Sequence, residues 1–367
     1  MLNEREYWFW LCNINGIGYQ KITELLDYYQ EVKEIFTAKE NTLSKIKSLV
    51  KKDIEYLSKV HEEDEVHRLY EKLIKEETKF VLQQDEDYPK AILQVYEPPY
   101  ALYVKGKLPD LTKPKLAIVG ARNCTNYGRE LSMYFARELA KEGVQIISGL
   151  AMGVDGYSHQ GALMADGYTL GVLGCGIDCC YPESNRYLYE QMKGKGGVMS
   201  EYGYHVKPRA GNFPRRNRII AGMSDAILVV EAKERSGSFI TVDQGLEQGK
   251  DIFVIPGRIT DELSVGCNRL ARMGAQVVCH PRDMLEYFHL DTKLENQVVG
   301  SLLEQTKEML SEEEIRLVGY LSLEPVYLGR LVEQMRLDVG RVSGLLIDLK
   351  LKQVIREVAK NYYALRV

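Results

Sequence analysis

Seven short apolar runs between residues 116 and 278 constrain the fold of this 367-residue chain more than any other feature. The runs are rich in Val, Ile and Leu, and most are separated by segments with helical periodicity, such as Glu130–Glu142 and Gly237–Gln248. The seven runs are Leu116–Val119, Val144–Ile147, Leu170–Leu173, Gly197–Met199, Ala226–Val230, Ile252–Ile255 and Gln276–Val278. Buried strands that alternate with helices predict an α/β fold with an extended, Rossmann-like, doubly wound and mainly parallel sheet.

The loops that follow these runs are the predicted binding region. In open parallel sheets, ligands bind beyond the carboxyl ends of the strands, where the strand order reverses. The loops are Gly120–Asn123, Ser148–Gly156, Gly174–Asp178, the stretch after Glu201, Ser236–Ser238 and Gly257–Arg258. Glycine in such loops allows close approach of a phosphate, although the same glycines would also serve tight turns that hold no ligand. Their repetition favours a ligand site.

The segment Lys207–Arg218 carries five cations and no acid, although the formal net charge of the chain is -4. Its cations are Lys207, Arg209, Arg215, Arg216 and Arg218. Phe213 and Asn217 are interleaved with them, and a local basic patch of this kind is typical of binding to a phosphate-rich partner. Most charge runs are solvated loops, but this one adjoins the glycine loops of the predicted sheet. Its position therefore favours a nucleic-acid interface.

Binding of single-stranded nucleic acid explains these features better than duplex reading. Arg122 follows the first apolar run, so we expect the basic segment and Arg122 to face the same rim. Phe213 offers a stacking face, and the glycine loops admit the sugar-phosphate chain. We expect Phe213 and Arg218 to be fixed in the site, while Lys207 and Arg209 are more mobile and add salt-sensitive attraction. No helical segment combines several arginines with amides on one face, as duplex reading requires.

The flanking segments predict two smaller domains. Residues 1–85 are helical and read as a SAM-like or helix-hairpin-helix-like domain, in which the turn Asn13–Gly18 could hold a phosphate or could simply use glycine for a positive φ. We favour the simple turn. Residues 86–290 form the predicted Rossmann-like DNA-binding domain, 291–310 a linker and 311–367 a winged-helix domain. The last helix of that domain carries only Arg341 and Lys350 beside Asp348, which favours contact with protein over duplex DNA.

No enzyme signature is complete in the sequence. The segment Gly174–Cys179 with the later Glu201 imitates a dinucleotide fingerprint, but Tyr181-Pro182 interrupts it before a helix can begin. Walker A and Gly-x-Ser-x-Gly motifs are absent, so we predict no catalytic residue and no cofactor. Asp155 and His159 could form an oriented base, yet a histidine packed against the sheet is the commoner outcome.

Cysteine usage and hydropathy exclude further classes. The chain has seven cysteines, an odd number, and Cys175, Cys179 and Cys180 form no paired C-x-x-C sets, so we interpret them as core residues and predict no metal site. No stretch approaches the roughly 18 apolar residues of a membrane span, and the N-terminus lacks a signal sequence. We therefore expect a cytoplasmic protein without a membrane span.

Five passages together resemble the DNA-processing protein A family, also called DprA or Smf. They are Ile118–Arg122, Ser148–Asp155 with His159, Leu173–Asp178 with Tyr181-Pro182, Phe213–Gly222, and Ser236–Ser238 with Thr241. The resemblance implies a non-enzymatic recombination mediator that binds and protects incoming single-stranded DNA during natural transformation and loads the RecA recombinase onto it. It also implies a homodimer formed through the Rossmann-like domain. The family commonly has serine where this chain has Ala121, so a hydroxyl contact to phosphate is absent there.

The motif positions and the loop argument together define the predicted DNA-binding residues. They are Gly120, Ala121, Arg122, Ser148, Gly149, Gly174, Gly176, Lys207, Arg209, Phe213, Arg215, Arg216, Asn217, Arg218, Ser236 and Ser238. The alternative is a nucleotide-binding protein or an enzyme that uses the same pocket. At the level of the fold, the domain also resembles nucleotide-cleaving phosphoribohydrolases of the lysine-decarboxylase-like group, but their Pro-Gly-Gly-x-Gly-Thr loop is replaced here by Arg235–Thr241.

Overall fold

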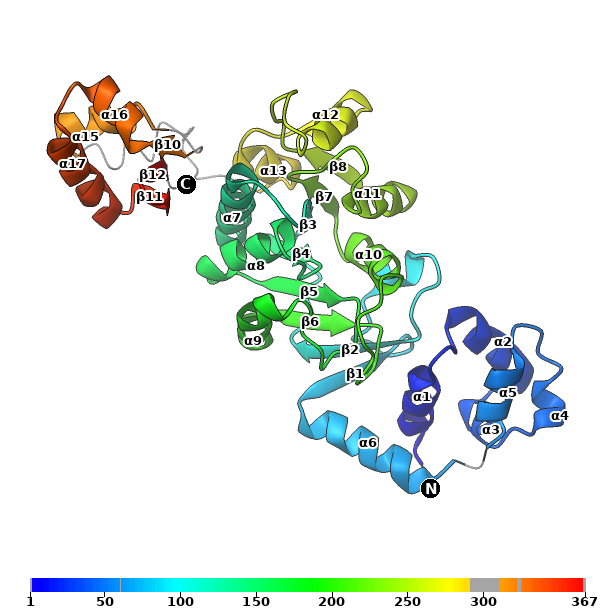
Figure 1. The fold of residues 1–367 in the computed structure, drawn as a ribbon. Helices are drawn as coiled ribbons and strands as arrows, with labels where there is room; N and C mark the ends of the chain where they lie inside the picture. The colour runs from blue at the N-terminus through cyan, green and yellow to red at the C-terminus, as the bar shows by residue number, and fades with distance from the viewer. Residues whose placement is uncertain (1, 60, 291–309, 322–324, 366–367) are drawn as a thin grey trace.

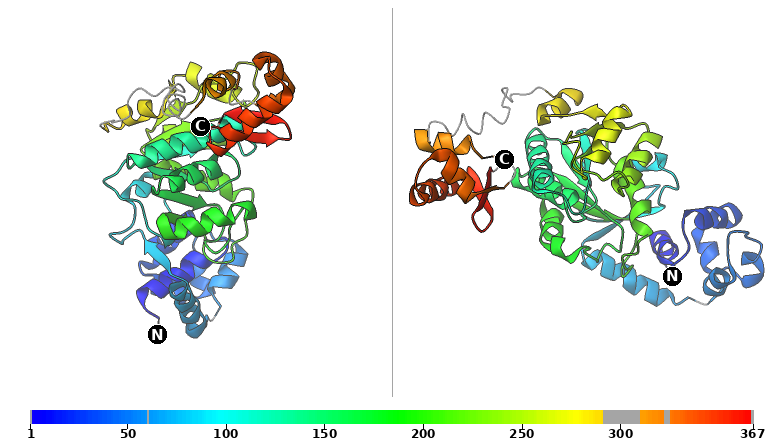
Figure 2. Two further views of the ribbon diagram at one scale, coloured as in Figure 1. Left: turned by 90° about the vertical axis from the view of Figure 1, so that its left-hand side faces the viewer. Right: turned by 45° about the horizontal axis from the view of Figure 1, so that its top comes forward.

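A computed structural model describes residues 2–59, 61–290, 310–321 and 325–365 of the chain. It shows a central α/β part with a helical part near the N-terminus and a small part near the C-terminus (Figure 1). The two smaller parts lie on opposite sides of the central sheet in every view (Figures 1 and 2). Apart from Leu310, the predicted linker 291–310 falls outside the described residues, and the predicted domain boundaries remain predictions.

Nine strands form the central sheet, in the order β1-β2-β6-β5-β4-β3-β7-β8-β9. Strands β3 to β9 are parallel, and their bounds are Lys115–Val119, Gln145–Ser148, Thr169–Leu173, Gly197–Ser200, Ala226–Val229, Asp251–Val254 and Gln276–Val277. These strands coincide with the seven predicted runs, so the predicted Rossmann-like sheet is confirmed. Strands β3 to β8 are buried almost throughout and are therefore mainly apolar, which is why they can be recognised in the sequence, whereas β9, which we expected to be buried, is exposed.

Two further strands extend the sheet at one edge. Strands β1 (Thr78–Leu82) and β2 (Ala101–Gly106) pair with each other, and β2 pairs with β6, all antiparallel. Strand β1 lies within residues 1–85, which we expected to be helical, whereas Ala101–Val104 in β2 is strand-like in the sequence, within a stretch that we interpret as a connection between domains. Five residues between an acidic helix and a turn are too few for periodicity to distinguish strand from helix. The sheet therefore begins before residue 86.

Helices cover both faces of the sheet, as a doubly wound fold requires (Figure 1). One face carries α7, α8, α9 and α13, with bounds Asn126–Lys141, Val154–Met164, Arg186–Lys195 and Pro281–Tyr287. The other face carries α10, α11, α12 and the 3-10 helix η1, with bounds Asn212–Gly222, Ser238–Glu247, Val265–Arg272 and Lys90–Gln94. Successive side chains of β3 point to opposite faces of the sheet, so that Leu116 and Ile118 pack toward α7 while Ala117 and Val119 pack toward α10 and α11.

The strand order reverses at β3, which places the loops after β3 and β7 side by side. After β3 the chain moves outward through β4, β5 and β6, and then crosses to β7 on the other side. Glu231 joins the two loops. Its carbonyl accepts from the Ala121 N–H at 2.8 Å, and its buried carboxylate accepts from the N–H of Thr125 at 2.8 Å and from the hydroxyl at 2.5 Å. The crevice predicted for ligands is thus held by a fixed framework.

Six helices precede the sheet. Their bounds are Glu4–Asn13 (α1), Tyr19–Tyr29 (α2), Val32–Phe36 (α3), Glu40–Leu43 (α4), Lys51–Leu57 (α5) and Glu63–Lys75 (α6). Buried aromatic contacts hold them, such as Trp10 against Phe36 with ring centroids 4.8 Å apart. The turn between α1 and α2 contains Gly16 at φ +93°, and Lys21 donates to the Gly16 carbonyl while it pairs with Asp53. Because these partners satisfy Lys21 inside the domain, the turn has the features of the simple interpretation.

The C-terminal part consists of three helices and a small antiparallel sheet. The helices are α15 (Glu312–Val318), α16 (Leu328–Met335) and α17 (Val339–Leu351), and the strands β10 (Val326–Tyr327), β11 (Ile355–Ala359) and β12 (Tyr362–Leu365) have the order β10-β12-β11. A capping box starts α15, with Ser311 and Glu314 each accepting from the other's backbone N–H. The winged-helix assignment remains a prediction. Among the described residues, no helix is long and apolar enough to cross a membrane.

Candidate nucleic-acid interface

A cavity of about 480 Å³ lies at the carboxyl ends of the parallel strands. Five consecutive βα loops, those after β3, β4, β5, β6 and β7, contribute to its lining. The predicted site residues that line it are Gly120, Arg122, Phe213, Arg216, Asn217, Ser236 and Ser238. The fold thus brings together residues that are more than 110 positions apart in the sequence, at the place where doubly wound sheets bind ligands.

An aromatic ring and a cation stand together in this cavity. The Arg122 guanidinium carbon lies 5.5 Å from the centre of the Phe213 ring, and Arg122 is otherwise exposed. The ring of Tyr181 lies 5.5 Å from that of Phe213 on another side. Beneath the ring is Gly174, where an added Cβ would lie only 2.7 Å from the ring carbon Cδ1. Glycine is therefore required at position 174 to seat Phe213 on the backbone that ends β5.

Helix α10 divides the basic segment between its two sides. Phe213, Arg216 and Asn217 face the cavity, whereas Arg215 and Arg218 face Glu201, which follows β6. Residues three apart share one side of a helix, and this periodicity produces the division. The Arg218 side chain is 5% exposed, and its Nη2 lies 2.5 Å from Glu201 Oε2. The structure does not bring Arg218 into the lining of the cavity, and its contact with DNA remains a prediction.

Arg216 is a buried cation at the floor of the cavity. The Arg216 guanidinium donates to the carbonyl of Gly149 at 2.8 Å and to the carbonyl of Val172. Arg216 as a whole is 4% exposed. An added Cβ on Gly149 would lie 2.5 Å from the guanidinium, so this glycine admits the arginine. Burial lowers the pKa of Arg216 to about 10, and no carboxylate in the described part of the chain forms an ion pair with it. A buried cation that is held by neutral acceptors favours an anionic ligand.

Three helices have their N-termini at this cavity, so the positive ends of three helix dipoles lie beside it. Helices α8, α10 and α11 contribute lining residues from their first turns, and none of the three has a side-chain hydrogen bond at its N-cap. The macrodipole makes the N-terminus of each helix positive, although the Val154 N–H of α8 and the Phe239 N–H of α11 already donate to the carbonyls of Ala121 and Ser236. With Arg122 and Arg216, the arrangement gives the cavity a positive potential suited to phosphate.

One acid lines the cavity and is engaged by the protein itself. The Asp155 carboxylate accepts from the N–H of Gly149 at 3.1 Å and belongs to a residue that is 8% exposed. Burial raises the pKa of Asp155, while the charge of Arg216 acts in the opposite direction. Asp155 therefore fixes the loop after β4 and reduces, without cancelling, the positive potential of two arginines.

Other predicted site residues hold the loops instead of lining the cavity. The Ser148 hydroxyl is fully buried and donates to the Ile118 carbonyl at 2.7 Å. At Gly176, an added Cβ would lie 2.5 Å from the Gly203 carbonyl, so the backbone of one loop packs on the next. Lys207 and Arg209 are exposed in the loop before α10, and the described residues offer them no acidic partner. These two side chains are free to meet a phosphate chain that leaves the cavity.

Tyr181 and Glu201 are the residues with a clear role that sequence reasoning did not assign to the site. Tyr181 lines the cavity beside Phe213, and its signal was its place in the loop after a predicted strand. Glu201 was considered only as part of a false dinucleotide motif, yet it pairs with both Arg215 and Arg218. The pairing of Glu201 with particular arginines depends on how α10 is oriented in the fold, and the sequence alone does not give that orientation.

The potential catalytic and metal-binding residues lie elsewhere or are engaged. His159 is fully buried, its Nδ1 lies 2.6 Å from the Thr169 hydroxyl, and burial lowers its pKa to about 3. It does not line the cavity. Burial also raises the pKa of the Cys175 and Cys180 thiols. Within the described ranges, no cluster of three or more His, Cys, Asp or Glu side chains is placed to hold a metal ion.

Comparison with known proteins gives a consistent set of relatives. The profile of the family described as DNA recombination-mediator protein A matches residues 79–289. Protein Smf of Synechocystis sp. is 30% identical over 386 residues, which cover 97% of this chain and 97% of that protein. The X-ray structure of DNA processing protein A from Streptococcus pneumoniae superposes with a TM-score of 0.67 at 32% identity, covering 77% of this chain and 97% of that one. DNA processing protein A from Helicobacter pylori, whose structure is titled for its single-stranded DNA binding mode, superposes with a TM-score of 0.53 at 31% identity, covering 57% and 95%.

Proposed function

Because this chain belongs to the DNA recombination-mediator protein A family, we propose that it binds single-stranded DNA in the cavity at the carboxyl ends of β3 to β7 and acts there as a recombination mediator. The observation that carries the proposal is the seat of Phe213, a ring fixed on Gly174 with the Arg122 guanidinium beside it. A base can stack on the ring while the phosphate of the same nucleotide pairs with the neighbouring cation.

The geometry favours a single strand over a duplex. Phe213 is half-buried in a cavity of about 480 Å³, so a base must leave its stack to reach the ring. The bases of a single strand are unpaired and can reach the ring directly, whereas a base pair of a duplex must open first. Lys207 and Arg209 are exposed cations outside the cavity, and they contact the phosphate backbone of any DNA strand without reading its base sequence. The related Helicobacter pylori protein, with its single-stranded DNA binding mode, supports the same conclusion.

The role of each predicted site residue follows from its surroundings. We propose that Arg122, Phe213, Arg216, Asn217, Ser236 and Ser238 contact DNA directly and that Gly120 offers its backbone. The backbone of Ala121 bonds to Glu231 and Val154, so this residue acts by holding the loop. Lys207, Arg209 and the partly exposed Arg215 add electrostatic attraction along the strand. The remaining predicted residues, Ser148, Gly149, Gly174, Gly176 and Arg218, act by holding these groups in place.

The wider cellular role is proposed on the strength of the family. We propose that the protein is a cytoplasmic homodimer that protects incoming single-stranded DNA during natural transformation and loads RecA recombinase onto it, without catalysing a reaction itself. The family membership supports this role, and the cavity contributes the DNA-binding step.

Titration with fluorescein-labelled oligonucleotides tests the proposed function. A 20-nucleotide dT strand is expected to bind at least tenfold more tightly than the matching duplex, and thymidine monophosphate is expected to compete poorly, because several phosphates contribute to affinity. Raising the salt concentration should weaken binding along a straight line in a logarithmic plot. Equal affinity for single strand and free nucleotide would contradict the mediator and would favour a nucleotide-binding protein instead.

A further inference from the structure

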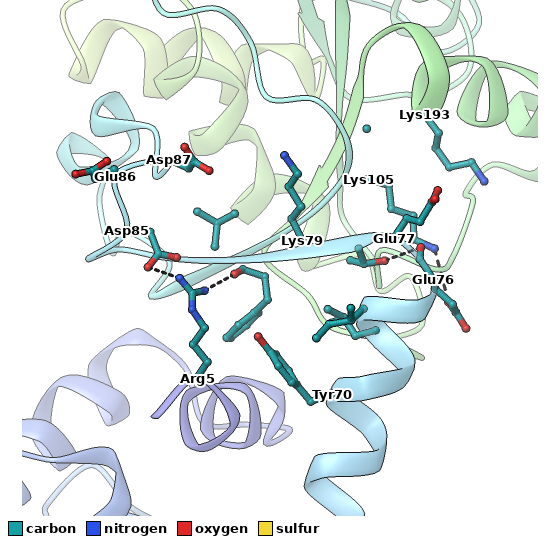
Figure 3. Close-up of a pocket in the computed structure, with 16 residues that line it drawn as sticks. Arg5, Tyr70, Glu76, Glu77, Lys79, Asp85, Glu86, Asp87, Lys105 and Lys193 are labelled. Atoms are coloured by element: carbon teal, nitrogen blue, oxygen red, sulfur yellow. Dashed lines mark hydrogen bonds and ion pairs between the residues drawn. The ribbon is translucent and has the colours of Figure 1, made fainter. Parts of the chain in front are cut away.

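A second cavity, of about 900 Å³, lies beside strand β1 and shares no lining residue with the first. Its walls come from α1, α6 and the segment around β1, as Figure 3 shows. Strand β1 is the last strand of the sheet and pairs only with β2. The cavity is therefore a groove along an open sheet edge, and such edges can accept a further strand.

The backbone of β1 presents hydrogen-bonding groups to this groove. Because the Gln83 N–H donates to the Tyr100 carbonyl, the alternation along the pair turns the backbone groups of Thr78, Phe80 and Leu82 outward. Asp85 satisfies both groups of Leu82, through its carboxylate at 2.9 Å and its own N–H at 2.9 Å. The outward N–H of Phe80 has no acceptor among the described residues.

Arg5 occupies one of the carbonyls that a new strand would need, that of Phe80. Its guanidinium donates to the Phe80 carbonyl at 3.0 Å and pairs with Asp85 at 2.7 Å, as Figure 3 shows. The Arg5 side chain is 45% exposed, so this contact lies at the surface and can exchange with a peptide N–H at little cost. Arg5 thus covers the edge in the absence of a partner strand.

The side chains around the groove select the character of a partner. On the α6 side, Ile74 is 53% exposed and stands near Tyr70. Three exposed acids, Glu77, Glu86 and Asp87, line the groove without a cationic partner in the part of the chain that the structure describes. Other acids of the lining are paired, such as Glu76 with Lys105 at 3.7 Å. Lys79 opposes this excess with a single charge.

We propose that this groove binds an extended, basic and apolar peptide segment of a partner protein, which pairs with the outer edge of β1 at Thr78 to Phe80. An apolar side chain of the peptide lies against Ile74, and basic side chains face Glu86 and Asp87. The outward N–H of Phe80, together with the Phe80 carbonyl once Arg5 releases it, requires an extended backbone, since a helix satisfies its own groups. The unpaired acids exclude the phosphate chain of a nucleic acid. The inference does not depend on DNA binding in the first cavity.

Fluorescence anisotropy with a labelled acetyl-Lys-Val-Lys-Val-Lys-Val-amide peptide and the full chain tests the proposal. We expect saturable binding, and no binding of the peptide in which Glu replaces each Lys. Ile74→Lys should weaken binding about tenfold because it removes the apolar surface under a valine of the peptide, and the double variant Glu86→Lys/Asp87→Lys should weaken it about tenfold because it places cations against the lysines. Glu142→Lys, a reversal at an exposed acid of α7's end, is the matched control and should bind as the parent does.

One further readout separates strand addition from adhesion by charge, and another tests the role of Arg5. The Phe80 amide hydrogen should exchange more slowly when the peptide is bound, which adhesion by charge alone does not cause. Arg5→Ala should bind the peptide more tightly, because it uncovers the Phe80 carbonyl and also leaves Asp85 without its cation. Unchanged Phe80 exchange on saturation, weaker binding by Arg5→Ala, or equal binding of the Lys and Glu peptides would overturn the proposal.

Discussion

Replacing Gly174 with alanine tests whether the seat of Phe213 matters for DNA binding. The new Cβ would lie 2.7 Å from Cδ1 and 3.1 Å from Cε1 of the Phe213 ring. Carbon atoms in contact normally lie about 3.5–4.0 Å apart, so the ring must move by about 1 Å or tilt. Arg122 and Tyr181 both contact the ring, and either movement disturbs the surface that a base would meet.

The expected loss follows from the value of one stacked base. Base–aromatic stacking contributes about 1–3 kcal/mol, which corresponds to roughly 5- to 150-fold in affinity. Phe213→Ala removes the stack and should show the full loss, while Gly174→Ala should show a part of it, about tenfold. Anisotropy titration with a labelled dT strand measures both. Gly174 is buried, so we expect the alanine also to lower the free energy of unfolding by about 1–3 kcal/mol through overpacking.

A double-mutant cycle distinguishes the seat from a general disturbance. If Gly174→Ala acts only through the ring, it should cause little further loss of affinity in a Phe213→Ala background. Gly194→Ala on α9 is the matched control, since an added Cβ there meets open space, and it should leave DNA affinity unchanged. An equal loss of affinity from Gly174→Ala with and without the Phe213 ring would refute the reasoning.

Three further predictions address the surroundings of the cavity. Arg218→Met should lower the free energy of unfolding, measured by urea titration, by about 3–5 kcal/mol, because it leaves the buried Glu201 carboxylate without its nearest cation. An unchanged free energy of unfolding would show that Arg215 alone compensates the Glu201 charge. Arg209→Ala should weaken binding of every single-stranded sequence alike and reduce the salt slope by about 0.7, and a sequence-dependent loss would count against a backbone contact. Because the pKa of His159 is lowered to about 3, only the unfolded chain binds its proton between about pH 6.5 and pH 3. The contribution of His159 to stability should therefore fall by about 2 kcal/mol from pH 7 to pH 5, and His159→Gln should lack that part of the pH dependence.

The central sheet could be predicted because buried parallel strands leave no choice of side chain. Runs such as Leu170–Leu173 are apolar at every position, and both faces of the sheet demand it. Strand β1 could not be predicted in the same way, because it is a short antiparallel edge strand between a helix and a turn. The place of β2 in the sheet follows from its pairing with β6, nearly 100 residues further along the chain, and β1 joins the sheet only through β2.

The place of the cavity and several of its lining residues could be predicted, but not which residues line it and which hold its loops. The rule that ligands bind beyond the strand ends brought Arg122 and Phe213 together correctly. The glycines of the loops were interpreted as room for phosphate, and the structure shows that Gly149 and Gly174 make room for Arg216 and Phe213 instead. Such internal packing depends on which side chain crosses from a neighbouring element, and no local pattern encodes it.

Photocrosslinking tests the central claim, that single-stranded DNA lies in the cavity over Phe213, most directly. When a dT strand that contains 5-iodouracil is irradiated, the carbon–iodine bond breaks, and the uracil carbon bonds to an aromatic side chain stacked on the base, with loss of iodine and of a ring hydrogen as hydrogen iodide. Mass spectrometry of the digested complex identifies that residue. We predict that the crosslink maps to Phe213 or Tyr181 and that Arg122→Ala reduces its yield. Crosslinks confined to peptides outside the loops after β3 to β7, with an unchanged yield in Arg122→Ala, would contradict the account.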